Sequence, residues 1–324
     1  MIVTGIESSA HTFGVGIFDT AKQKILANEK EMYKIGSKGI IPAKVSEFHA
    51  KNAAKVISRA LQNAHVELGD IDCIGYTKGP GIGTCLQIGM LSAKTLAYKL
   101  GVPLVPVNHA VAHVEIAKFF AKLKDPLSVY VSGGNSQILK LSGSHYAVLG
   151  ETFDIGVGNM LDNFARAARL KPAWGSTVAK LAERGNYIEM PYTVKGMDFT
   201  FTGLLTYARK QIGNAPIEDI CYSLQETAFS MICEAAERAL LLTKSKELCV
   251  CGGVAQSERL RQMLGLLAKE HDAKFGYAPN EYNADNGAMI AYVAGKAAEH
   301  GYAVPVESAS IEQRYRIEDA IVWQ

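Results

Sequence analysis

The chain has 324 residues, of which 48% are hydrophobic and 20% charged, and its formal net charge at pH 7 is +2. This length predicts about two domains, and the balance of residue types is that of a folded globular protein. A net charge so close to zero excludes a strong overall field that attracts nucleic acid, although a local basic patch stays open.

The six cysteines form no C-x-x-C pair, so we expect reduced core residues rather than a disulfide framework. The chain opens directly on a strand-like apolar pattern, which indicates no signal peptide. No apolar run approaches the roughly 18 residues that span a bilayer. We therefore expect a cytoplasmic protein with no membrane partner.

The first part of the chain alternates between strand and helix patterns. Apolar spacing typical of helices follows His49 and Gly83, and Asn108 is a good N-cap for a further helix. The expected strands are short and apolar and lie at 2–7, 13–18, 24–27, 72–77 and 102–107.

From residue 127 the opening pattern of strand, polar turn, strand and strand is repeated, with strands at 127–131, 137–140 and 146–150. Helices are expected across 156–243, broken by an irregular segment near 190–202. After these come a strand at 248–251, a glycine turn, a helix at 258–269, a short strand and a closing helix at 288–299. The alternation predicts α/β layers in two similar halves that face a cleft, divided into residues 1–125 and 126–324.

The most distinctive short motif is His109-Ala-Val-Ala-His113. Histidines four residues apart lie on one face of a helix, where two neutral imidazoles can reach one divalent metal. The metalloprotease helix has His-Glu-x-x-His with the glutamate as general base, but here that position is Ala110. The alternative is a pair of partly buried histidines with ordinary hydrogen bonds.

Three polar or glycine loops each follow a strand. Ser8-Ser9 and the loop 132–136 can turn backbone N–H groups toward phosphate oxygens, and Gly252-Gly253 lies between a strand and a helix, where an anion is favoured. Each of the first two loops alone is also compatible with a simple hairpin. Asp285 is also compatible with a helix N-cap, and Tyr130 with a core aromatic residue.

Nearly the whole chain resembles the catalytic subunits of tRNA N6-threonylcarbamoyladenosine synthesis, the TsaD family formerly called O-sialoglycoprotein endopeptidases. It is most similar to the archaeal and eukaryotic branch, whose members work in the KEOPS complex. The motifs that carry the resemblance are Gly5-Ile6-Glu7, 78–81, 107–113, 130–135, 154–162, 192–198, 222–226, 252–255 and 285–291.

The resemblance implies a duplicated actin-like fold (the ASKHA group, ribonuclease H-like), with the metal helix in the N-terminal half and nucleotide loops with a helical insertion in the C-terminal half. It implies one divalent metal, iron or zinc, on His109, His113, Tyr130 and Asp285. It also implies that an adenine nucleotide, ATP or threonylcarbamoyl-AMP, contacts the following residues: Ser9, Tyr130, Val131, Ser132, Gly133, Gly134, Asp162, Gly175, Ala179, Gly253 and Ser257.

The sequence departs from the family at three of these positions. Ser9 ends the stretch Glu7-Ser8-Ser9, where the family has Glu-Gly-Thr. Ala179 stands where the family has a glutamate that holds ribose hydroxyls, and Ser257 stands where it has asparagine. We therefore expect weaker or differently seated nucleotide binding beside an intact metal site. Trp174, in the stretch that replaces a Pro-Gly-Gly-Pro motif, is a candidate to stack on the base.

By resemblance, the activity is transfer of threonylcarbamoyl from threonylcarbamoyl-AMP to the adenine N6 next to the anticodon, in tRNAs that read ANN codons. His109 and His113 are the expected catalytic residues. A non-catalytic nucleotide-binding scaffold and a metal-dependent peptidase are the alternatives, and the missing base at Ala110 speaks against the peptidase.

The implied partners are tRNA, a small kinase-like ATPase and a small dimerising subunit. Lys34, Lys38 and Lys44 are candidates for a basic surface, with an ordinary solvated face as the alternative.

Overall fold

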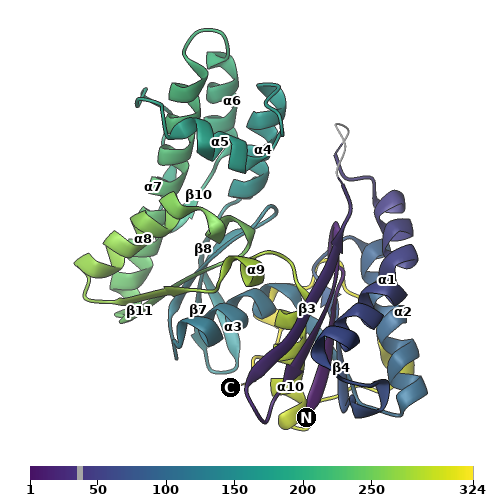
Figure 1. Ribbon diagram of the computed structural model, residues 1–324. Coiled ribbons are helices and arrows are strands. Elements are labelled where there is room, and N and C mark those ends of the chain that lie inside the picture. The colour runs from purple at the N-terminus through teal and green to yellow at the C-terminus, as the bar shows by residue number, and fades with distance from the viewer. Residues whose placement is uncertain (35–38, 324) are drawn as a thin grey trace. The chain divides into compact units, whose positions relative to one another are not determined.

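The computed structural model describes residues 1–34 and 39–323, so Lys38 lies outside the described residues. The chain divides into two compact units (Figure 1). The first joins Met1–Ile116 with Gly143–Tyr146 and Pro279–Gln324, and the second contains Ala117–Ser142 and Ala147–Ala278. Among the described helices, none has the length and apolar content that crossing a bilayer requires.

The first unit is built on a five-stranded sheet in the order β3-β2-β1-β4-β5. Strand β1 pairs antiparallel with β2 and parallel with β4, and β4 pairs parallel with β5. The strands are β1 (Ile2–Glu7), β2 (Thr12–Asp19), β3 (Lys24–Met32), β4 (Cys73–Gly79) and β5 (Leu104–Asn108).

Helices cover both faces of this sheet (Figure 1). Side chains of β2 alternate, so that Phe13, Val15 and Ile17 face the core shared with α1 (Pro42–Ala64) and α2 (Gly83–Leu100). The glycines between them face α10 (Gly287–Glu299) on the opposite side. The unit also contains the short helix α9 (Asn280–Asn283) and the first residues of α3 (His109–Ala121).

The second unit repeats the arrangement. Its sheet has the order β12-β11-β6-β7-β8. When these strands are numbered by their order in the chain and read from β8 to β12, they run 3-2-1-4-5, as in the first sheet. The central strand pairs antiparallel with β7 and parallel with β11, as β1 does with its neighbours. The strands are β6 (Leu127–Val131), β7 (Ser136–Ser142), β8 (His145–Glu151), β11 (Glu247–Cys251) and β12 (Lys274–Tyr277).

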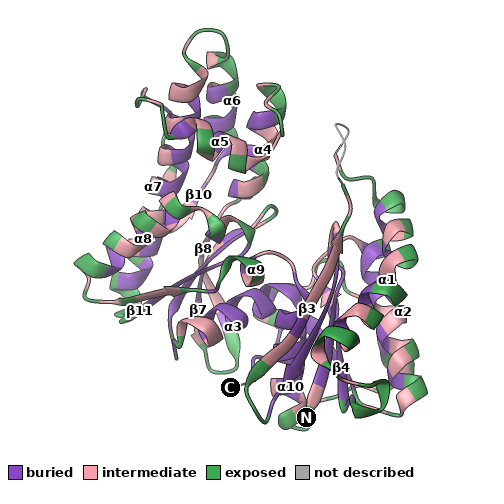
Figure 2. Ribbon diagram, viewed as in Figure 1, coloured by how far each residue is buried: buried purple, intermediate pink, exposed green. Residues whose placement is uncertain are grey.

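A large apolar core joins this sheet to the helices of the second unit, and Figure 2 shows its central strands and the inner side of α7 as buried. The irregular segment expected near 190–202 contains a small hairpin of β9 (Val194–Lys195) and β10 (Asp198–Phe199). The helices are α4 (Val157–Ala167), α5 (Gly175–Ala182), α6 (Thr202–Gln211), α7 (Ile217–Thr243) and α8 (Glu258–Glu270).

The predicted strands and helices are confirmed, with differences at their ends. Helix α1 begins at Pro42 rather than near His49, because Pro42 starts a helix without losing a needed donor. Strand β3 continues to Met32, five residues past its expected end, since pairing with β2 holds its polar residues in the sheet. All six cysteines are free thiols, as expected.

Candidate metal centre and nucleotide loops

Asn108 starts the helix that carries the two histidines. Its side-chain oxygen accepts hydrogen bonds from the backbone N–H groups of Ala110 (2.9 Å) and Val111 (3.1 Å), as the sequence predicts for an N-cap. Its amide nitrogen donates to the carbonyl oxygens of Tyr315 (3.2 Å) and Arg316 (3.1 Å). One side chain therefore both caps α3 and attaches residues near the C-terminus to it.

His109 and His113 lie one turn apart on α3, with ring centroids 4.6 Å from each other. Asp285 approaches both, and its Oδ1 lies 3.6 Å from Nε2 of His109 and 3.4 Å from Nε2 of His113. Potential ligand atoms of these three residues all lie within 4.8 Å of one another. The first unit therefore brings Asp285 to two histidines that lie 172 and 176 positions earlier in the chain.

Asp285 owes its position to helix α10, which packs against the sheet with its backbone. A Cβ added at Gly16 would lie 2.2 Å from the backbone nitrogen of Ala288, and one at Gly5 would lie 2.1 Å from that of Ala291. Only glycine permits so close an approach. Asn286 caps the helix by accepting from the N–H of Met289 (3.0 Å), which fixes the chain direction directly after Asp285.

Glu7, at the end of β1, is a fully buried carboxylate behind His109. Its Oε2 lies 3.0 Å from Nδ1 of His109 and accepts a hydrogen bond from the Thr77 hydroxyl (2.7 Å). Its Oε1 accepts from the backbone N–H of Ser9 (2.6 Å). With Nδ1–H donating to Glu7, the Nε2 atom of His109 is left as the nitrogen that faces Asp285.

The charges of this cluster shift its pKa values strongly. Burial alone lowers the pKa of His109, but the charge and hydrogen bond of Glu7, with the charge of Asp285, outweigh it and raise the pKa to about 9. Burial raises the pKa of Asp285, but the hydrogen bond to His113 and the two imidazoles bring it well below its usual range. Burial keeps the pKa of His113 below its ordinary value. Two carboxylates thus favour a cation at this place.

Tyr130 belongs to the second unit, where it is 1% exposed at the end of β6. Its ring lies beside Gly252, whose φ of +92° and close approach to the Val131 carbonyl oxygen exclude a side chain. Within the second unit, Tyr130 therefore sits where the two loops after β6 and β11 meet.

The loop 132–136 is bound to the start of α4. Backbone N–H groups of Gly158 and Asn159 donate to the carbonyl oxygens of Ser132 and Gly133, both at 3.2 Å. The loop 132–136 therefore accepts hydrogen bonds from the first turn of α4, and its residues Gly133 and Gly134 are exposed. Gly253 is also exposed, with open space where a side chain would be.

Asp162 and Gly175 are joined by a hydrogen bond, since Oδ1 of Asp162 accepts from the first N–H of α5 (2.6 Å). Ala179 lies one turn further along α5 and is half-buried. Ser257 caps α8 by accepting from the N–H of Leu260 (3.4 Å). The expected nucleotide residues of the second unit thus lie at the end of β6, in the loops after β6 and β11, within α4 and α5, and at the start of α8.

Comparison with known proteins gives the family. The model of the TsaD family, tRNA N6-adenosine threonylcarbamoyltransferase, matches residues 21–292. A protein of Thermofilum pendens named tRNA N6-adenosine threonylcarbamoyltransferase is 46% identical over 326 residues, which cover 99% of this chain and 97% of that protein. The chain belongs to the TsaD family.

Two further likenesses extend this result. A protein of Methanothermobacter thermautotrophicus named probable bifunctional tRNA threonylcarbamoyladenosine biosynthesis protein is 44% identical, over 99% of this chain and 60% of that protein. The solved structure of HypF from T. kodakarensis matches 93% of this chain and 48% of its own, with a TM-score of 0.64 and 16% identity. The fold is the duplicated actin-like α/β fold that the sequence predicts.

The three clustered residues fit a bound cation. Two imidazole nitrogens and a carboxylate oxygen are a donor set that suits zinc or iron. A tetrahedral site with bonds of about 2.1 Å places its ligand atoms about 3.4 Å apart, close to the 3.4 and 3.6 Å separations found between Asp285 and the histidines.

Glu7 was not predicted as a site residue. In the sequence, Glu7 stands out only as part of the motif Gly5-Ile6-Glu7. A glutamate at the end of an apolar strand has no spacing relationship to a histidine 102 positions later. A charged residue at the end of an otherwise apolar strand is the sequence signal that could have drawn attention to it, because a glutamate is almost never fully buried without a partner.

Proposed function

We propose that this TsaD-family chain is a tRNA N6-adenosine threonylcarbamoyltransferase that acts within a KEOPS-type complex. It transfers the threonylcarbamoyl group from threonylcarbamoyl-AMP to N6 of the adenosine next to the anticodon, in tRNAs that read ANN codons. The observation that carries the proposal is end-to-end similarity to relatives of that name, at 46% identity in the case of Thermofilum pendens. The His109–His113–Asp285 cluster supports it.

In this reaction a C–N bond forms between N6 and the carbamoyl carbon, and the C–O bond to the phosphate of AMP breaks. AMP leaves with the electron pair, and one N6 proton is lost. The exocyclic amine is a weak nucleophile because its lone pair is delocalised into the ring, so the carbonyl group must be activated. A bound zinc or iron ion supplies Lewis acidity for that purpose.

The chain's own residues would hold the reactants. His109, His113 and Asp285, with Tyr130 as the fourth ligand implied by the family, would hold the metal, and Glu7 would orient His109. The exposed backbone of Gly133 and Gly134 would face the phosphate. Ala179 offers no carboxylate to ribose hydroxyls, so the adenylate would be held mainly by backbone groups and by Asp162.

Several finer points belong to the same proposal. The partners are tRNA, a small kinase-like ATPase and a small dimerising subunit. The relative that is named as bifunctional supports a partner with a second activity. This chain matches only 60% of that protein, so the rest of it is available for another function. Since tRNA is the substrate, we place the reaction in the cytoplasm.

The test is the double variant His109→Ala/His113→Ala, assembled with its partners and assayed for metal content and for threonylcarbamoyl transfer to tRNA. We expect loss of bound metal and of transfer, with both retained in the control His145→Ala, whose side chain is exposed. Unchanged transfer by the double variant would refute the proposed chemistry. A wild-type complex that binds adenylate but transfers nothing would favour the scaffold alternative, and chelator-sensitive peptide cleavage would favour the peptidase.

A further inference from the structure

Two helical segments of the second unit contain basic residues and no acidic ones. Residues 163–182 and 199–217 include neither aspartate nor glutamate, although the whole chain has 34 basic and 32 acidic residues. The basic residues of these segments are Arg166, Arg169, Lys171, Lys180, Arg209 and Lys210, and all six are exposed. Positive charge is therefore concentrated here in a chain that is nearly neutral.

The fold brings the ends of these two segments together. Arg166 lies in the last turn of α4 and Arg209 in the last turn of α6. The Arg166 guanidinium donates to Oδ1 of Asn163 (2.6 Å), and that of Arg209 donates to the backbone oxygen of the same residue (3.5 Å). Arg169, Lys171 and Lys210 lie within a few residues of these two along the chain.

The positive charges of this region have no acidic partner among the described residues. Two guanidinium groups share one neutral asparagine, and within the described residues no carboxylate forms an ion pair with Arg166, Arg169, Lys171, Arg209 or Lys210. The partial negative charge at the C-termini of α4 and α6 favours nearby cations by about 0.3–1 kcal/mol for each helix.

The basic residues near the N-terminus are arranged differently. On α1, Lys51 pairs with Glu47 (2.7 Å) and Lys55 with Glu31 (3.1 Å), and Lys44 lies close enough to Glu47 to affect its pKa. Acidic neighbours thus neutralise the face that carries Lys44. The residues Arg166, Arg169, Lys171, Arg209 and Lys210 form a surface that we call the α4–α6 basic surface. None of these five residues pairs with a carboxylate from the part of the chain that the structure describes.

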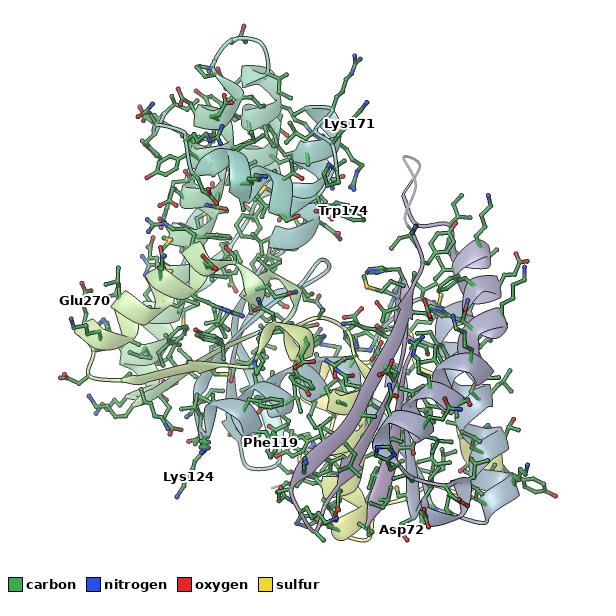
Figure 3. All side chains as sticks on the ribbon, viewed as in Figure 1. Asp72, Phe119, Lys124, Lys171, Trp174 and Glu270 are labelled. Atoms are coloured by element: carbon green, nitrogen blue, oxygen red, sulfur yellow. The ribbon has the colours of Figure 1, made fainter. Side chains whose placement is uncertain are left out.

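We propose that the α4–α6 basic surface binds the phosphate backbone of the tRNA substrate. The inference rests on the proposed function, which supplies a polyanion as substrate. Arginine suits the role because its planar guanidinium can form two parallel hydrogen bonds with phosphate. Figure 3 shows Lys171 and Trp174 along the same edge of the second unit, and Trp174, which is half-buried, adds an aromatic ring of the kind on which unpaired bases stack.

The test compares the variant Arg166→Gln/Arg209→Gln with Lys244→Gln/Lys269→Gln, both in the full chain assembled with its partners. The control removes the same charge from exposed positions of the same unit. The measurements are the dissociation constant for tRNA between about 50 and 200 mM salt, and single-turnover transfer at saturating tRNA. Circular dichroism and melting temperature confirm that each variant is folded.

We expect the arginine variant to bind tRNA roughly tenfold more weakly at about 0.1 M salt, with the slope of log K against log salt reduced by about 1 to 2. Arg166→Lys/Arg209→Lys should restore most of the affinity, and the control should bind as wild type does. If the wild type transfers threonylcarbamoyl and the arginine variant binds tRNA as tightly as the control does, the inference about this surface is overturned. If wild type transfers nothing to any tRNA, the proposed function fails instead.

Discussion

Oε2 of Glu7 and Nδ1 of His109 lie 3.0 Å apart, with the carboxylate completely buried and also bonded to Thr77 and the Ser9 backbone. A carboxylate on the second nitrogen of a ligating histidine fixes the ring orientation and its tautomer, and raises the basicity of the nitrogen that binds metal. Glu7 would therefore act on a bound metal through His109, without being one of the three clustered residues that could hold it.

The first prediction concerns this pair. Glu7→Gln should lower metal affinity by about 10- to 100-fold, because the amide keeps the shape of the side chain but not its charge. Titration calorimetry with zinc measures the effect, and nitrogen NMR of the imidazole reports the tautomer of His109. Glu299→Gln, an exposed change at the end of α10, should leave both unchanged. Equal affinity in the two variants would contradict the assignment of Glu7.

The second prediction concerns pH. Since the folded-state pKa of His109 is raised to about 9 from an ordinary 6.5, its protonation stabilises the metal-free protein fully below about pH 6.5. This stabilisation falls as the pH rises and is gone above about 9. The melting temperature of metal-free protein should decline across this range more steeply than that of His109→Gln. If the melting temperatures of the wild type and of His109→Gln fall equally with pH, the His109 imidazole is not charged between Glu7 and Asp285.

The third prediction concerns the approach of α10 to the sheet. Gly16→Ala places a Cβ 2.2 Å from the backbone nitrogen of Ala288, so the helix must move. We expect a loss of about 1–3 kcal/mol or more in the free energy of unfolding, as for other overpacked cores, together with lower metal occupancy. Gly69→Ala, where a Cβ meets nothing within 4 Å, is the control and should change neither quantity in denaturant unfolding and metal analysis.

The fourth prediction separates the two roles of Asn108. Asn108→Ala should cost about 2 kcal/mol or more, since it removes an N-cap and the two hydrogen bonds that its amide donates to the carbonyl oxygens of Tyr315 and Arg316. Aspartate is as good an N-cap as asparagine, but it would set a carboxylate oxygen against the carbonyl groups of Tyr315 and Arg316. We therefore expect Asn108→Asp to rescue little of the lost stability in thermal unfolding. Full rescue by aspartate would mean that only the cap matters.

The fifth prediction concerns the departure at Ala179. Ala179→Glu should tighten AMP binding by roughly tenfold, because it would supply the carboxylate that the family resemblance implies for ribose hydroxyls. Calorimetric titration with AMP measures the change. Ala182→Glu is unsuitable for comparison because Ala182 is buried, so Ser176→Glu, at an exposed position of the same helix, is the control. Unchanged affinity in Ala179→Glu would place the ribose elsewhere.

Local patterns in the sequence predicted most strands, the helix after Asn108 and the repeated module, because each depends on neighbouring residues. The pairing of Glu7 with His109, and the approach of Asp285 to both histidines, could not be read from any spacing. They depend on the parallel pairing of β1, β4 and β5 and on the return of α10 to the first sheet. The metal ligands and nucleotide residues named from the family stay predictions.

The glycines of β1 and β2 have a consequence for anyone who redesigns this protein. Gly5, Gly14 and Gly16 define how far helix α10 stands from the sheet, and Asp285 is the residue that precedes its cap. A methyl group added at any of these three glycines would therefore displace the Asp285 carboxylate, although the glycines themselves are not among the candidate metal-binding residues. Variant libraries that are designed to change the candidate metal site should keep these three glycines unchanged.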